Sequence, residues 1–243
     1  MEAHAEGLEG RPHRAEVLDL RIECPTRSGN LMNPPLTPPR AAAVAGIIFS
    51  ALMVGSLAII RVAVPADPTK PGIWLTDSTH RNAVRLALNL VPFAGIAFLW
   101  FMGVLRNRIG ASEDKFFATL LLGSGLLFIG SLFASSVVAG ALLEMPGGDI
   151  QSASLEIYYF ARRASYTFLN VFAIKMAGMF IFSTCTIALR TAIFPRFVAF
   201  SGFVCGLALL LVISNWLWIA LLFPLWILLV STQILVADRM RCS

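Results

Sequence analysis

The sequence predicts an all-α fold, a polytopic transmembrane bundle of six helices with both termini in the cytoplasm. Hydrophobic residues make up 57% of the 243-residue chain and charged residues only 14%, whereas a soluble domain carries about a quarter charged residues. The apolar residues gather in six long segments after residue 40, and crossing a bilayer core takes roughly 20 such residues per helix. None of these segments contains Asp, Glu or His.

The N-terminal residues 1–40 are polar and end in a proline-rich run at residues 34–39. They contain no apolar stretch of the kind that a signal peptide needs. We expect a disordered segment with a stiff polyproline-type spacer before the membrane, and Met32 is an alternative natural start. The transmembrane domain is then expected over residues 41–237, with a short cytoplasmic tail at residues 238–243.

The expected helices follow from the limits of the apolar segments. The last two form a nearly continuous stretch that, as one helix, would be about 60 Å long, twice the hydrocarbon thickness. A hairpin that turns at Ser214 and Asn215 avoids this, because Asn favours turns. The six helices are expected at residues 41–60, 83–105, 116–143, 166–189, 197–213 and 216–236.

Two long connections, at residues 61–82 and 144–165, lie between the expected helices. The second sets apolar residues such as Tyr158 beside charged residues such as Arg162. This pattern suits a short amphipathic helix at the membrane surface, and an early start of the following membrane helix explains it equally well.

The orientation is predicted from Lys and Arg. The side that holds both termini carries about twice as many of them as the side that holds the two long connections. Basic residues gather in cytoplasmic loops, so both termini are expected in the cytoplasm. The net charge of +5 is explained by this topology, and we expect the lipid bilayer rather than nucleic acid as the partner.

Lys175 is the least expected residue inside an apolar segment. It lies about 13 Å below the outer boundary of the expected fourth helix, and a lysine at such depth costs at least a few kcal/mol. With Asn89, Ser135 and Asn170 it forms a candidate polar pocket that opens outward. In the structural alternative, backbone and serine oxygens hold Lys175, and each Asn makes an interhelical hydrogen bond.

Gly202 and Gly206 form a GxxxG motif in the expected fifth helix. Small residues at this spacing let two helix backbones approach closely. We favour packing inside the bundle over dimerisation for this pair.

Histidine occurs only at His4, His13 and His80, outside every expected helix. This excludes haem held by two intramembrane histidines, an intramembrane zinc site and a Ser-His intramembrane protease. A proton relay through buried carboxylates has no members, and no nucleotide-binding motif is present. We therefore expect no cofactor, no metal and no catalytic site.

Two stretches carry a family resemblance. Residues 106–116 (RNRIGASEDKF), running into residues 122–128 (LGSGLLF), resemble the second cytoplasmic turn of small polytopic membrane proteins common in bacteria. Residues 218–226 (WIALLFPLW) are similar to the last helix of those proteins. Their activity is uncharacterised, so the resemblance implies a multi-pass protein of the inner (plasma) membrane and no function.

Three classes of function remain. The first is a structural or regulatory subunit that packs against another membrane protein or a second copy. The alternative is a carrier or channel-like protein for an anionic or lipid-like solute, with Lys175 as its counter-charge. An enzyme ranks last, because its acid–base groups would have to come from His80 and the outer carboxylates Asp67, Asp77, Glu144, Asp149 and Glu156.

Overall fold

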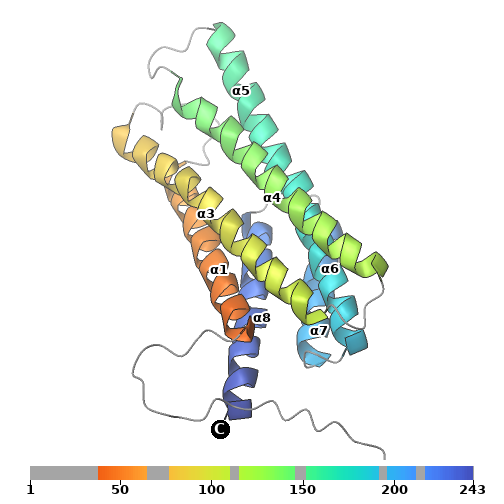
Figure 1. Ribbon diagram of the computed structural model, residues 1–243. Helices are drawn as coiled ribbons and strands as arrows, with labels where there is room; N and C mark the ends of the chain where they lie inside the picture. Colours follow the sequence, from red (N-terminus) through yellow and green to blue (C-terminus); the bar gives the residue numbers. More distant parts are fainter. Residues whose placement is uncertain are drawn as a thin grey trace, which may run out of the picture. The chain divides into compact units, whose positions relative to one another are not determined.

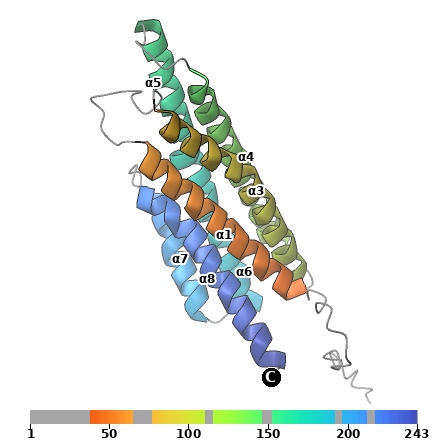
Figure 2. The ribbon, with the colours of Figure 1, turned by 90° about the vertical axis from the view of Figure 1, so that its left-hand side faces the viewer.

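A computed structural model describes residues 38–64, 77–109, 115–145, 152–191, 196–211 and 217–242. All regular structure in these residues is helical, and the helices lie side by side as a bundle (Figures 1 and 2). The predicted all-α helix bundle is confirmed. Its elements are α1 (Pro38–Ala63), α3 (Ser78–Ile109), α4 (Lys115–Leu143), α5 (Ser152–Thr167), the π-helix η1 (Phe168–Ala173), α6 (Ile174–Thr191), α7 (Arg196–Leu211) and α8 (Leu217–Cys242).

Five helices of the described part are long and apolar enough to cross a membrane, and the chain is a multi-pass membrane protein. One of the five is the continuous rod α5–η1–α6, whose apolar part covers Leu155–Arg190. The exception is α7, which has 16 residues and is about 24 Å long. Roughly 30 Å is needed to cross the hydrocarbon, so α7 falls short of it.

The largest difference from the expected elements is the start of the fourth helix. It begins at Ser152 rather than at residue 166 and reaches Thr191 without a break. Of the two alternatives for this stretch, the early start is therefore right, because no Pro or Gly interrupts the chain between Ser152 and Ala177. The last helix continues to Cys242, through most of the expected tail. Residues 1–37 and the expected turn at residues 214–215 lie outside the described residues.

A change of register divides the long rod. In η1 the backbone follows the π pattern, in which Ile174 N–H bonds to the carbonyl of Leu169, five residues earlier. A π segment inserts an extra residue into a helix and often lies at a functional site. It allows α5 and α6 to present differently directed faces while remaining one rod.

Phenylalanine rings occupy the centre of the bundle. The ring of Phe98 in α3 lies 5.0 Å from that of Phe49 in α1, 5.1 Å from that of Phe180 in α6 and 5.3 Å from that of Phe128 in α4. The ring of Phe223 in α8 is 4.8 Å from that of Phe128. The pairs are tilted or edge-on, which aromatic quadrupoles favour. These buried rings join five helices.

The GxxxG pair lies inside the bundle. A Cβ on Gly206 would lie 3.2 Å from the carbonyl oxygen of Gly178 in α6, and a Cβ on Gly202 would collide with Cys185 and Trp226. Both glycines therefore serve contacts of α7 with its own neighbours α6 and α8.

We expect Gly202→Ala to lower the thermal stability of the detergent-solubilised protein, because overpacking costs about 1–3 kcal/mol. Gly130→Ala is the matched control: a Cβ there meets no atom within 4 Å. This control should be neutral or stabilising by up to about 1 kcal/mol. Equal melting temperatures for the two variants would contradict the close packing.

Candidate functional site

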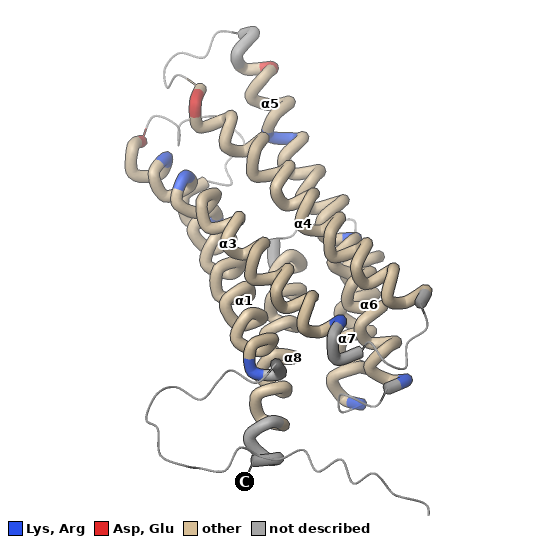
Figure 3. Tube along the Cα trace, viewed as in Figure 1, with Lys and Arg blue, Asp and Glu red and all other residues tan. Residues whose placement is uncertain are grey.

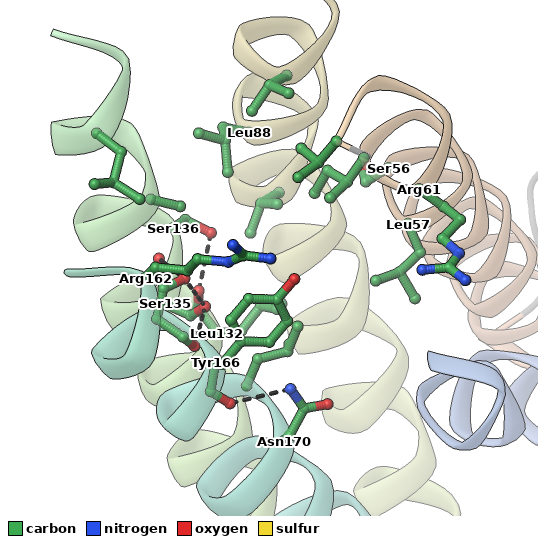
Figure 4. A pocket seen from close by; sticks show the side chains of 18 of the residues that line it. Ser56, Leu57, Arg61, Leu88, Leu132, Ser135, Ser136, Arg162, Tyr166 and Asn170 are labelled. Atoms are coloured by element: carbon green, nitrogen blue, oxygen red, sulfur yellow. Dashed lines mark hydrogen bonds between the residues drawn. The ribbon is translucent and has the colours of Figure 1, made fainter. Parts of the chain in front are cut away.

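A cavity of about 270 Å³ lies between α1, α3, α4 and the α5–η1 part of the rod (Figure 4). Most of its wall is apolar, so it suits hydrocarbon better than water. The buried apolar wall includes Met53, Leu57, Val84, Val91, Leu132 and Leu142.

The phenylalanine cluster closes the inner end of the cavity. Phe49 and Phe128 precede the wall residues Met53 and Leu132 by one helical turn each, on the side away from the long connections. These rings pack against Phe98, so in the described part of the chain close packing begins where the wall of the cavity ends.

Hydrogen bonds join the two helices on one side of the cavity. Ser135 Oγ of α4 donates to the carbonyl of Ser165 in α5 at 2.9 Å, and Ser165 Oγ donates to the carbonyl of Ser135 at 3.1 Å. Asn170 Nδ2 donates to the carbonyl of Tyr166 at 3.1 Å, within its own rod. Both serine hydroxyls thus donate within the protein, whereas Asn170 donates one of its two amide hydrogens there.

Two arginines lie on facing walls of the cavity (Figure 4). Arg61 closes the apolar part of α1, and Arg162 lies on α5 with its guanidinium carbon 5.8 Å from the centre of the Tyr166 ring. In the described part of the chain neither arginine forms an ion pair. The cavity therefore combines an apolar wall with two positive charges that lack an acidic partner there.

A repeat in the sequence marks the α5–η1 wall of the cavity, but the expected helix limits include only part of that repeat. Tyr158, Arg162, Tyr166 and Asn170 recur at every fourth residue and all line the cavity, because residues four apart share one helix face. A helix that starts at residue 166 cuts this series in half. Arg61 and Arg162 were thus explained by topology alone.

Lys175 lies at the end of α7 rather than at the cavity. Its ammonium donates to the carbonyls of Leu209 and Leu210 at 3.1 and 2.5 Å. The last carbonyls of a helix have no partner within it, and an unsatisfied one costs several kcal/mol in hydrocarbon. A positive charge also complements the negative end of the helix dipole.

The four residues of the sequence-predicted pocket are thus divided. Ser135 and Asn170 line the cavity, whereas Lys175 contacts α7. Asn89 lies on an exposed face of α3 and does not line the cavity. The Asn170 amide and the Ser135 hydroxyl therefore share the cavity with two arginines rather than with Lys175.

The N-terminal end of α3 carries several charged groups. Asp77 Oδ1 accepts the Thr79 N–H at 2.8 Å, which caps the helix, and Asp77 Oδ2 lies 2.8 Å from His80 Nδ1. The backbone hydrogen bond from Thr79, followed by the charge of His80, lowers the pKa of the Asp77 carboxyl. Arg85 pairs with Glu144 at 3.3 Å. Asp77 is the only outer carboxylate with a described contact to His80, and that pair serves the cap.

Comparisons of the chain with protein-family models, with curated proteins and with solved structures find no match. The functional argument therefore depends on the residues of the cavity and of the bundle around it.

Lys175→Met should destabilise the bundle, because it leaves two carbonyls of α7 without a donor at about 1–3 kcal/mol each. The measurement is the melting temperature in detergent. Asn89→Leu, at an exposed position on α3, is the control and should leave the temperature unchanged. If Lys175→Met melts like the wild type, the ammonium does not hold the end of α7.

The Asp77 cap should titrate. Its folded-state pKa is below the ordinary value of 3.8, so the cap stabilises α3 above that value and is lost as the pH falls through the lowered pKa. Asp77→Ala should expose the start of α3 to hydrogen exchange at neutral pH, and the difference from wild type should vanish in acid. Asp77→Asn keeps an accepting oxygen and should protect α3 at every pH. If the difference in hydrogen exchange between Asp77→Ala and the wild type persists in acid, the cap does not titrate.

Proposed function

We propose that this membrane protein binds an anionic, lipid-like solute in the cavity between α1, α3, α4 and α5. The observation that carries this proposal is the pair Arg61 and Arg162, which face each other across an apolar cavity without an ion-pair partner in the described part of the chain. Of the functions considered from the sequence, this is closest to the carrier or channel-like protein for an anionic or lipid-like solute, with the counter-charge moved from Lys175 to the two arginines.

The chemistry of the cavity specifies an amphiphile. A half-buried arginine such as Arg162 is stabilised by a carboxylate or phosphate, which its planar fork of donors matches in two parallel hydrogen bonds. The wall of Leu57, Leu132 and Leu142 gains only from apolar groups, at about 25 cal/mol per Å² buried. A ligand that satisfies both parts has a negative head and a hydrocarbon portion.

The structural or regulatory role has less support. Gly202 and Gly206, one of the small-residue faces that could receive a partner, are occupied by contacts of α7 with α6 and α8. The closed inner end of the cavity also disfavours an open channel, so binding with release to the same side is the simplest action.

The distribution of charge supports the orientation that we propose (Figure 3). Arg40 at the start of α1, Arg106 near the end of α3 and Arg190 at the end of α6 lie at one end of the bundle, while Arg85 lies with Asp77 and Glu144 at the other. Over the whole chain, the side of the first end carries about twice as many Lys and Arg as the other side. By the positive-inside rule the first end is cytoplasmic. The cavity then lies in the outer half of a plasma (inner) membrane.

Arg162→Ala should weaken binding of lysophosphatidic acid to the purified protein by about tenfold, the effect of one lost charged hydrogen bond. Arg163→Ala is the matched control, because Arg163 is its exposed neighbour on α5 and does not line the cavity. Native mass spectrometry measures the lipid affinity of both variants, with lysophosphatidylcholine as the zwitterionic comparison. Equal affinity in the wild type and in an Arg61→Ala/Arg162→Ala double variant would refute the proposal.

A further inference from the structure

Resting on that proposed function, we infer that the ligand enters sideways from the outer leaflet, through a mouth between α1 and α5, and that its head is a phosphate monoester. The ligand is thus a membrane lipid of the phosphatidic acid type. A phosphate ion dissolved in water would interact with the arginines in the same way, but it would enter from the aqueous phase instead of from the bilayer.

The mouth is identified by exposure. Of all the residues that line the cavity, only Arg61 of α1 and Tyr166 of α5 are exposed. The residues contributed by α3 and α4 are buried or half-buried, as Val91 and Leu132 are. An exposed residue that also lines a cavity marks its rim, so the rim runs between α1 and α5.

The short helix α7 does not reach this mouth. The end of α7 is held beside Lys175, whereas the cavity residues of the same rod run from Tyr158 to Asn170, further toward the outer end. No residue of α7 or of the described part of α8 lines the cavity. A helix long enough to span the hydrocarbon in the position of α7 would continue past Lys175 toward the level of Asn170.

The height of the mouth matches that of lipid headgroups. Asn170 lies about 30 Å from Arg190 along the rod at 1.5 Å per residue, which is close to the thickness of the hydrocarbon. With Arg190 at the cytoplasmic surface, Asn170 therefore reaches the outer boundary, and Tyr166 and Arg162 lie just beyond it. Arg61, which follows the apolar span of α1, lies at the same boundary.

The charge of the two arginines and the volume of the cavity indicate which lipid headgroup fits. A phosphate monoester carries about −1.5 to −2 charges near neutral pH, which complements the two guanidinium groups better than a singly charged diester does. The cavity of about 270 Å³ is below the roughly 300–1,000 Å³ of pockets that enclose a drug-sized ligand. It therefore accepts the head and the adjacent carbons, while the acyl chains extend through the mouth into the bilayer.

The test uses the whole protein in nanodiscs of phosphatidylcholine that contain phosphatidic acid with a diazirine near the carboxyl end of one acyl chain. After illumination, we expect crosslinks in peptides that carry residues 57–64 and 166–172 to exceed those elsewhere by about tenfold, the ratio that one charged contact supports. The same probe with a phosphatidylglycerol head should be enriched less. An Arg61→Gln/Arg162→Gln variant should lose the enrichment, and Arg163→Gln should keep it.

Competition with inorganic phosphate separates the two sources of the phosphate group, and it requires no variant. Crosslinks that persist in excess phosphate support lateral access by the lipid. If phosphate abolishes them, an anion from water occupies the cavity in preference to the lipid, so the assignment of a membrane lipid as the ligand is refuted while anion binding by the cavity stands. Crosslinks spread evenly over the lipid-facing helices, and insensitive to both arginines, would overturn the proposed function as well.

Discussion

The bond between Lys175 and the end of α7 is the interaction on which the rest of the arrangement depends. A bilayer does not satisfy free carbonyls, so a helix that ends within it needs a donor from a neighbour. Lys175 supplies that donor to Leu209 and Leu210. Because α7 can stop there, the outer part of α5 stands clear of it, and the cavity remains open on that side.

The bundle divides into a tightly packed half around the phenylalanine cluster and a half that contains the cavity. In the first half, five phenylalanine rings pack against one another around Phe98 of α3. In the second half, the serine pair Ser135 and Ser165 joins α4 to α5, while α1 and α3 lie across the cavity from them. A packed half beside a hollow one is an arrangement suited to binding from one end of the bundle.

The fold was predictable because hydrophobicity and length alone determine which segments cross a bilayer. The candidate site was less predictable than the fold. Ser135, Asn170 and Lys175 stand out in the sequence because polar residues inside apolar segments are rare. The contact of Lys175 with the carbonyls of Leu209 and Leu210 corresponds to the structural alternative, in which backbone and serine oxygens hold it, but the sequence does not reveal which carbonyls these are. Arg162 was missed because the start of its helix depends on the absence of breakers over residues 152–165, where charge suggested a surface segment. The use of Asp77 as a cap likewise depends on where α3 begins.

The π-helix gives this rod one place where a change in chain length is absorbed. Since η1 accommodates an extra residue between α5 and α6, a deletion of one residue within Phe168–Ala173 would let the rod become a regular α-helix, with α5 and α6 close to their present phase. A deletion elsewhere in the rod would turn everything after it by about 100° relative to what precedes it. Tyr166 at the cavity or Lys175 at the end of α7 would then lose its present neighbours. The number of residues between η1 and each of these side chains is therefore as much a part of the design as their identities.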